Sequence, residues 1–377
     1  MKKIRMGMIG GGPGAFIGDA HRRASRICND FELVGGIFSS DYEKSKEFAK
    51  NEGISPFRCY ENVDALIKNE SEMPADKRME VVSIVTPNDL HFPAAKSLLN
   101  AGFHLVCEKP MTMKVKEAEE LERLVTVKKL TFAVAHTYTG YPMIRQMKEL
   151  IASGVLGTIQ RIDAQYYQGW INSIIHGTES RITGVWRLDP KHAGASSCMG
   201  DIGVHAFNLI EYTTGLEIKE ILSDLSPVKN NIKLDLDGTV LLRFGKYLKG
   251  VIRASQVCGG EENNLRLAIY GSKASLKWGQ ENPNILYMLS DQEQTKIFKP
   301  AHSYNGPMAE AAQTMPCGHP EGIYEALANI YKGVAKSIRG EKFIPGEFPT
   351  VHEGVRGMKF IQSVVDSDKK GNVWVKI

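Results

Sequence analysis

The sequence predicts two domains: an α/β domain with a parallel sheet, followed by an α+β domain built on an open, mostly antiparallel sheet flanked by helices. Strand-like and helix-like segments alternate in the first part of the chain, and consecutive strand-like runs fill the second half. At 377 residues the chain also exceeds what one hydrophobic core usually serves. We expect residues 1–137 to form the first domain and residues 138–377 the second.

The first element is residues 4–21, in which an apolar strand breaks into a glycine-rich turn before a helix. Glycine reaches positive φ cheaply and lets a ligand lie against the main chain. The spacing Gly10-x-Gly12-x-x-Ala15 fits the GxGxxG/A fingerprint of a Rossmann domain, with the turn at Gly10, pyrophosphate approach at Gly12 and helix packing near Ala15. We therefore expect a bound NAD or NADP. The expected contacts in this turn are Gly10, Gly12, Gly14, Ala15, Phe16 and Ile17.

The residues after the second strand bear on which cofactor is bound. NAD-binding proteins usually place an acid at this point, where it bonds the ribose 2′-hydroxyl. Here Ser39 and Ser40 come first and can hydrogen-bond a 2′-phosphate, whereas Asp41 stands two or three positions late. An alternative interpretation is that Ser40 and Glu43 form a capping box for a helix over residues 42–51. We expect Ser39 and Ser40 to contact the cofactor, and the choice between NAD and NADP stays open.

Two further apolar runs, residues 81–88 and 102–110, predict parallel strands that end in polar motifs. Ligands of open α/β sheets gather outside the carboxyl ends of the strands. Residues 86–91, which follow the first strand, can instead form an Asx turn leading into a helix at residues 92–101. Lys109, which follows the second strand, can be a solvated loop charge. The side chains expected to face the cofactor are Thr86, Pro87, Asn88, His91, Glu108 and Lys109.

The second half of the chain predicts an antiparallel sheet, because its strand-like runs are joined by hairpin-length turns. These runs cover residues 158–168, 218–226, 238–244, 247–256, 264–270 and 274–278. A helix is predicted from about residue 197 to residue 214. On it Asp201 and His205 lie one turn apart. Such a pair can be an ordinary surface pair, but two glycines in the same turn favour close approach to the backbone.

Four motifs together resemble the glucose-fructose oxidoreductase, inositol dehydrogenase and rhizopine catabolism (Gfo/Idh/MocA) family over most of the chain. They are the glycine turn, the Thr-Pro-Asn-x-x-His loop, Glu108-Lys109-Pro110 and Asp201-x-Gly203-x-His205. The resemblance implies NAD(P)-dependent oxidoreduction at a CH–OH group, with the last motif facing Lys109 across a cleft. It also implies that the outer face of the second domain's sheet makes a dimer or tetramer contact.

Hydride transfer from a secondary alcohol also requires a base at the hydroxyl, which leads to roles for three residues. Histidine titrates near neutral pH, so His205 is the expected base. Asp201 is expected to orient this histidine or to bind substrate, and Lys109 to bind the hydroxyl and stabilise the developing alkoxide. The residues expected to contact substrate are Lys109, His136, Tyr138, Trp186, Arg187, Asp201 and His205. The stretch around His136 departs from the commoner Asn/Arg-bearing version of the family, which leaves the substrate open.

Composition excludes several other classes of protein. The net charge of +4 is small, and no block of like charges suggests nucleic acid or a membrane surface as partner. The six cysteines are widely spaced with no CxxC, which favours reduced thiols in the cytoplasm over disulfides or a zinc ribbon. A metal site at Cys198, Asp201 and His205 lacks a further ligand at suitable spacing. The glycines arrive before a signal-peptide core can form, so we expect no leader.

The predicted activity is oxidoreduction of a sugar, sugar derivative or cyclitol by a homodimer or homotetramer. Two alternatives remain. Some relatives use bound NAD to oxidise a sugar transiently, eliminate its glycosidic substituent and reduce it again, so that the net reaction is hydrolysis. The second alternative is a regulator that binds the cofactor without catalysis. The presence of Lys109, Asp201 and His205 together disfavours this alternative.

Overall fold

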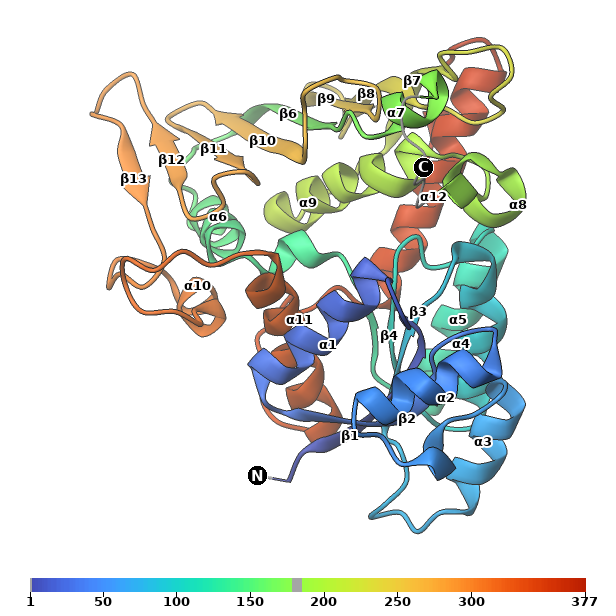
Figure 1. Ribbon diagram of the computed structural model, residues 1–377. Helices are drawn as coiled ribbons and strands as arrows, with labels where there is room; N and C mark the ends of the chain where they lie inside the picture. The colour runs from blue at the N-terminus through green and yellow to red at the C-terminus, as the bar shows by residue number, and fades with distance from the viewer. Residues whose placement is uncertain (1, 178–184) are drawn as a thin grey trace. The chain divides into compact units, whose positions relative to one another are not determined.

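The computed structural model describes residues 2–177 and 185–377, which form two compact units (Figure 1). Unit 1 consists of Met1–Gly140 and Ile323–Val355, and unit 2 of Tyr141–Gly322 and Arg356–Ile377. The sequence-based division at residues 137 and 138 therefore misses a return of the chain to unit 1. This return occurs because helix α11 (Ile323–Arg339) buries one apolar face in the core of unit 1.

Unit 1 is built on a five-stranded parallel sheet in the order β2-β1-β3-β4-β5. Its central strands are mostly apolar because helices cover the sheet, and every residue of β3, including Ser83, is buried. The strands are β1 (Ile4–Gly10), β2 (Phe31–Ile37), β3 (Val81–Val85), β4 (His104–Cys107) and β5 (Phe132–Val134). The Rossmann architecture expected from the sequence is confirmed.

The helices of unit 1 connect these strands, and α11 packs along α1 although some 300 residues separate them (Figure 1). They are α1 (Phe16–Cys28), α2 (Tyr42–Asn51), α3 (Val63–Glu72), α4 (His91–Asn100), α5 (Val115–Lys128) and α11, with short 3-10 turns η1 (Pro56–Arg58), η2 (Asn88–Leu90) and η3 (Thr137–Gly140). Helix α12 (Val351–Lys369) begins in unit 1 and ends in unit 2.

The start of α2 differs from the capping box expected from the sequence. Asp41, not Ser40, is the N-cap, and its carboxylate accepts hydrogen bonds from the backbone N–H groups of Glu43 and Lys44. Tyr42 is the first helical residue, so Ser40 lies one position too early to cap it. Asp41 therefore has a structural role beside any role at the ribose.

Unit 2 is built on a nine-stranded sheet in the order β13-β12-β11-β10-β6-β9-β8-β7-β14. All its neighbouring strands are antiparallel except β6 and β9, so the mostly antiparallel sheet is confirmed. The strands are β6 (Ile159–Tyr167), β7 (Glu220–Ser226), β8 (Asp237–Arg243), β9 (Lys249–Ser255), β10 (Asn264–Gly271), β11 (Ser275–Gly279), β12 (Leu286–Leu289), β13 (Lys296–Phe298) and β14 (Val375–Lys376). The last three are short, lie at or next to the sheet edges, and were not predicted.

The sequence predicted a single helix for Asp201 and His205, but the structure shows two helical types in this segment. It begins as a π-helical segment, η5 (Met199–Gly203), and continues as α9 (Val204–Thr214), which ends at Gly215 in the left-handed conformation. The other helical segments of unit 2 are α6 (Pro142–Ala152), α7 (Ile171–His176), η4 (Val185–Leu188), α8 (Pro190–Ala193) and α10 (Pro307–Ala312). No helix within the described residues is both long and apolar enough to cross a membrane.

Candidate active site

The glycine-rich turn after β1 packs tightly against its own surroundings. Gly10 has a φ of 86°, as the predicted turn requires. A Cβ on Gly12 would overlap the carbonyl oxygen of Phe38, so the residue after β2 by itself demands glycine there. A Cβ on Gly18 would overlap Gly11, so Gly18 has the helix-packing role that we had given to Ala15. These contacts fix the start of α1 close to the sheet.

The N-terminus of α1 fits the phosphates of a dinucleotide. Its N-cap, Ala15, provides no side-chain hydrogen bond to the first-turn N–H groups. Gly14 has a φ of 75° and open space where a Cβ would stand, and the side chain of Phe16 is 65% exposed. Since a helix N-terminus attracts anions through its N–H groups and dipole, this open end can hold a pyrophosphate.

Two of the residues expected to face the cofactor also hold the ligand-edge loops together. His91 is fully buried, with its ring nitrogens 2.9 Å from the carbonyl oxygens of Pro110 and Thr86. The carboxylate of Glu108, 7% exposed, lies 2.9 Å from Nε2 of His21 and accepts a hydrogen bond from the backbone N–H of Lys109. The imidazole and the carboxylate thus have partners inside unit 1, and their expected contact with the cofactor stays a prediction.

The charge on Glu108 is stabilised inside the protein. Burial alone would raise the pKa of this carboxyl group. The hydrogen bond from His21, followed by the charge of Lys109, outweighs that effect and holds the pKa below its usual range. Lys109 therefore follows a buried carboxylate, at a cis peptide bond to Pro110.

His136 lies within electrostatic reach of Lys109. It is 2% exposed, and burial together with the positive charge of Lys109 lowers its pKa to about 3. The ring is therefore neutral at physiological pH. Tyr138, in the next turn, is also buried. The neutral imidazole and the lysine form the polar end of unit 1 at β4 and β5.

In unit 2 the carboxylate of Asp201 is held by two side chains. Its Oδ2 lies 3.1 Å from Nε of Arg187 and accepts a hydrogen bond of 3.0 Å from the Gln256 amide. The Arg187 guanidinium lies 4.5 Å from the ring centre of Trp186 and 5.9 Å from that of Trp170. The predicted residues Trp186, Arg187 and Asp201 thus form one cluster.

His205 and its helix are fixed by residues that the sequence did not indicate. The His205 ring is 7% exposed and lies 6.3 Å from the ring of Tyr166. Asp235, also buried, accepts hydrogen bonds from the backbone N–H groups of Ser197 and Met199 at the start of the helical segment. This carboxylate anchors the turn that carries Asp201 and His205.

Sequence reasoning missed Gln256 and Asp235 because each is a single polar residue in an otherwise ordinary strand region. Gln256 directly follows β9, and Asp235 precedes β8. Their position at strand ends was the available signal. Cys198, considered above as a metal ligand, is fully buried, and burial raises the pKa of its thiol well above the usual value. Within the described residues no cluster of three or more His, Cys, Asp or Glu side chains could hold a metal ion.

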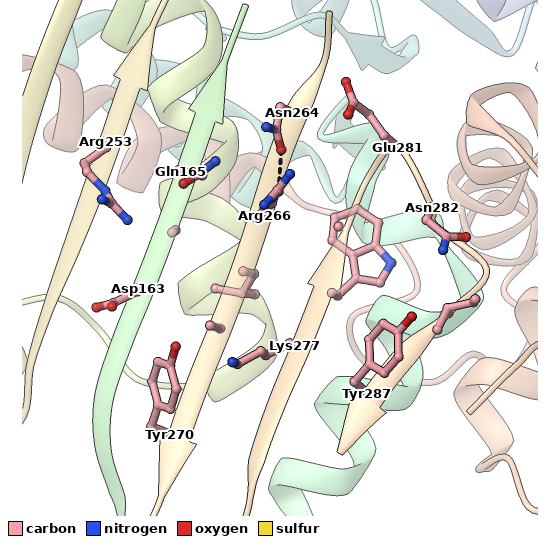
Figure 2. Close-up of a pocket in the computed structure, with 16 residues that line it drawn as sticks. Asp163, Gln165, Arg253, Asn264, Arg266, Tyr270, Lys277, Glu281, Asn282 and Tyr287 are labelled. Carbon is pink, nitrogen blue, oxygen red and sulfur yellow. Dashed lines mark hydrogen bonds between the residues drawn. The ribbon is translucent and has the colours of Figure 1, made fainter. Parts of the chain in front are cut away.

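A hollow in unit 2 is lined by none of the residues of this cluster. It measures about 520 Å³ on the face of the sheet formed by β6, β9, β10, β11 and β12 (Figure 2). Asp163 and Gln165 line it, whereas their neighbour Tyr166 points to the opposite face, on which the His205 ring lies. No residue predicted to bind cofactor or substrate lines this hollow.

The comparisons with known proteins agree with the resemblance. A model described as the oxidoreductase family with an NAD-binding Rossmann fold matches residues 4–136, and one described as a GFO/IDH/MocA C-terminal domain matches residues 144–277. An uncharacterised oxidoreductase of Bacillus subtilis, YfiI, is 32% identical over 384 residues, covering 100% of this chain and 97% of that protein. Levoglucosan dehydrogenase of Pseudarthrobacter phenanthrenivorans is 25% identical over 340 residues, covering 81% of this chain and 82% of that protein.

Among solved structures, an inositol dehydrogenase homolog from Azotobacter vinelandii, complexed with NADH and myo-inositol, superposes with a TM-score of 0.91. It is 30% identical in sequence, and the match covers 100% of this chain and 98% of that one. Two findings assign the chain to a family: the full-length match to an oxidoreductase at more than 30% identity, and the matches to the two family models. The chain belongs to the Gfo/Idh/MocA family of oxidoreductases, with an NAD-binding Rossmann domain at its N-terminus.

Proposed function

We propose that this oxidoreductase transfers a hydride between NAD and a secondary alcohol or ketone of a sugar, sugar derivative or cyclitol. The observation that carries the proposal is the polar cluster of unit 2, in which Arg187 and Gln256 hold the Asp201 carboxylate one turn from His205. Carboxylate, amide and guanidinium groups beside indole rings suit a ligand rich in hydroxyls. The inositol and levoglucosan dehydrogenases similar to this chain act on compounds of that kind.

Three residues have proposed catalytic roles. The imidazole of His205 takes the hydroxyl proton during oxidation and returns it during reduction. Lys109 donates a hydrogen bond to the same oxygen and stabilises its developing negative charge. Asp201 orients His205 or accepts a hydrogen bond from a neighbouring substrate hydroxyl. When bound, the nicotinamide would supply the hydride acceptor, and the glycine turn at Gly10 with the uncapped start of α1 would hold the phosphates of the dinucleotide.

NAD is the proposed preference over NADP because of Asp41. Backbone hydrogen bonds from Lys44 and Glu43 hold the pKa of this carboxyl group below its usual value, although burial acts the other way. An ionised carboxylate just after β2 repels a 2′-phosphate and can accept a bond from a ribose hydroxyl. Ser39 Oγ, one of the two serine contacts expected from the sequence, accepts a hydrogen bond from the Asp41 backbone N–H.

The proposal is tested by following absorbance at the NADH band over a panel of cyclitols and sugars, with NAD and NADP in separate assays. We expect Lys109→Ala or His205→Ala to reduce turnover about 100-fold or more while NADH binding is retained. Lys116→Ala, at an exposed position of α5, is the matched control for the loss of a lysine. Unchanged turnover in Lys109→Ala and His205→Ala would refute the assigned roles.

The same assays separate the alternatives. Cleavage of a glycoside without net formation of NADH would support transient oxidation and elimination. A failure of every polyol and ketose, with NADH still bound, would support a regulator. We also propose a homo-oligomer, testable by light scattering, and a cytoplasmic location, which the six unpaired cysteines favour.

A further inference from the structure

Four buried polar side chains of unit 1 form a hydrogen-bonded series that ends at the Glu-Lys-Pro motif. Ser83 Oγ of β3 lies 2.7 Å from the Tyr331 hydroxyl of α11. That hydroxyl lies 2.8 Å from Nδ1 of His21 in α1, and Nε2 of His21 lies 2.9 Å from Oε1 of Glu108. The other oxygen of Glu108 accepts the backbone N–H of Lys109 at 3.1 Å. We call these four side chains the Ser83–Glu108 chain.

The donors of this chain can all point toward the carboxylate. An ionised carboxylate only accepts, so Nε2 of His21 carries the proton that it donates to Glu108. In a neutral imidazole Nδ1 is then an acceptor, and it receives the hydroxyl proton of Tyr331. The Tyr331 oxygen in turn accepts from Ser83. Hydrogen bonds aligned in one direction polarise one another, which stabilises the negative charge of Glu108.

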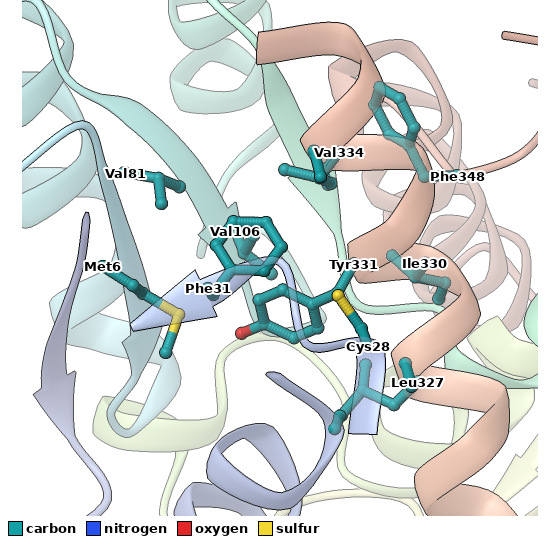
Figure 3. Close-up of a cluster of buried hydrophobic side chains, with 14 of the residues drawn as sticks. Met6, Cys28, Phe31, Val81, Val106, Leu327, Ile330, Tyr331, Val334 and Phe348 are labelled. Atoms are coloured by element: carbon teal, nitrogen blue, oxygen red, sulfur yellow. The ribbon is translucent and has the colours of Figure 1, made fainter. Parts of the chain in front are cut away.

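The polar groups of the Ser83–Glu108 chain are buried, so water cannot replace their hydrogen-bond partners. Ser83, His21 and Tyr331 are each 0% exposed, and Tyr331 is part of the main hydrophobic cluster of unit 1 (Figure 3). The Tyr331 ring packs edge-on against Phe31, with centroids 5.2 Å apart, and against His21 at 5.8 Å. A polar group removed from such a site leaves its partner unsatisfied, which costs more than the bond itself contributed.

We propose that His21 and Tyr331 are positioning residues that act through Glu108 to fix the backbone of Lys109. This proposal rests on the catalytic role proposed for Lys109. It also gives a reason why residues 323–355 return to unit 1, since α11 provides the hydroxyl group at the far side of His21. Neither residue is required to touch substrate or cofactor.

Tyr331→Phe tests the proposal, with Tyr60→Phe as a matched control. Tyr60 is also buried in unit 1, and its hydroxyl donates to Glu70 at 2.6 Å. Both variants therefore lose one buried tyrosine hydroxyl that hydrogen-bonds inside unit 1. Hydrogen exchange of the protein without substrate is followed in peptides that contain Lys109. We expect exchange there to be about fivefold faster in Tyr331→Phe, the effect of one buried hydrogen bond, and unchanged in Tyr60→Phe.

Turnover gives the second measurement. We expect Tyr331→Phe and His21→Gln to lower kcat about tenfold with little change in the KM for NAD, because Lys109 is displaced and the glycine turn is not. In a Lys109→Ala background the same substitutions should have no further effect on kcat, since residues that act through one group are not additive. A purely structural effect would be additive and would also appear in Tyr60→Phe.

The outcomes separate this proposal from the proposed function. If the unmodified protein turns over no polyol, the proposed function fails, and the positioning role fails with it. If the unmodified protein is active and Tyr331→Phe keeps its kcat, only the positioning role is refuted. Faster exchange at Lys109, lower kcat and non-additivity with Lys109→Ala together would establish it.

Discussion

The two units support their proposed catalytic residues in different ways. In unit 1, Lys109 follows Glu108, whose carboxylate is bound inside the core by His21 from another helix. In unit 2, Asp201 is bound by Arg187, whose side chain is 31% exposed, while Asp201 itself is 17% exposed. Removing the partner of a buried carboxylate is costly, whereas a partly exposed ion pair contributes little to stability. The backbone of Lys109 is thus bound to a buried group of unit 1, whereas the polar cluster of unit 2 stays partly exposed.

The largest effect on stability is expected at Asp235, the buried exception within unit 2. Asp235→Asn replaces a carboxylate that accepts the N–H groups of Ser197 and Met199 and the hydroxyl of Ser196. We expect the free energy of unfolding to fall by about 2 kcal/mol. Urea denaturation measures it, with the exposed Asp224→Asn as control. Equal stability of the two variants would show that the start of this helix is held by other contacts.

The pH dependence of stability is expected to reflect buried histidine in unit 1. The pKa of His136 is about 3 in the folded protein, against 6.5 as the ordinary value. Unfolded chains therefore bind a proton below about pH 6.5 that the folded protein binds only near pH 3, so stability falls as the pH falls through this window. In His136→Gln the free energy of unfolding should decrease less steeply as the pH falls, with a slope smaller by at most about 1.4 kcal/mol per pH unit. Identical slopes, from urea denaturation at pH 4 to 7, would contradict a neutral buried ring.

Substitution of Arg187 tests whether the polar cluster of unit 2 binds substrate or only stabilises the fold. Arg187→Lys keeps the charge but loses the planar group that packs on Trp186 and bonds Asp201. We expect the KM for substrate to rise about tenfold and stability to change by less than about 1 kcal/mol. Arg161→Lys, which alters an exposed pair with Asp163, is the control. A large loss of stability with unchanged KM would make the cluster structural.

The smallest effect is expected at Asp41, where the carboxylate is half exposed in unit 1. Asp41→Asn removes the charge and keeps a good helix cap, so α2 should persist. We expect the ratio of kcat/KM for NADP to that for NAD to rise about fivefold, as for a screened surface charge. Glu43→Gln, in the first turn of the same helix, should leave the ratio unchanged. An unchanged ratio in Asp41→Asn would remove Asp41 from the cofactor choice.

Local patterns predicted much of this fold. The glycine turn, the buried strand β3 and six strands of unit 2 follow from short stretches in which residue type and neighbours agree. The return of α11 to unit 1 could not be predicted in this way. An amphipathic helix requires an apolar partner surface, and its own sequence does not say which core supplies it.

The histidines show the same limit at the candidate site. His91 lies in a loop motif at the ligand edge, which predicted a cofactor contact, yet its ring is buried with each nitrogen 2.9 Å from a carbonyl oxygen of unit 1. His21 looked like an ordinary helix residue, and it binds Glu108. Position along a strand predicts which loops are near a ligand. It does not determine which side chain of the loop turns inward, because that depends on partners distant in sequence.

Isotope transfer tests the central claim most directly. A polyol that the panel identifies as substrate, deuterated at the carbon that is oxidised, is incubated with the protein and NAD, and the reduced cofactor is analysed by mass spectrometry. We expect the reduced cofactor to carry deuterium with the unmodified protein and to be nearly absent with Lys109→Ala. Reduced cofactor without deuterium, or equal amounts from both proteins, would contradict hydride transfer that depends on Lys109.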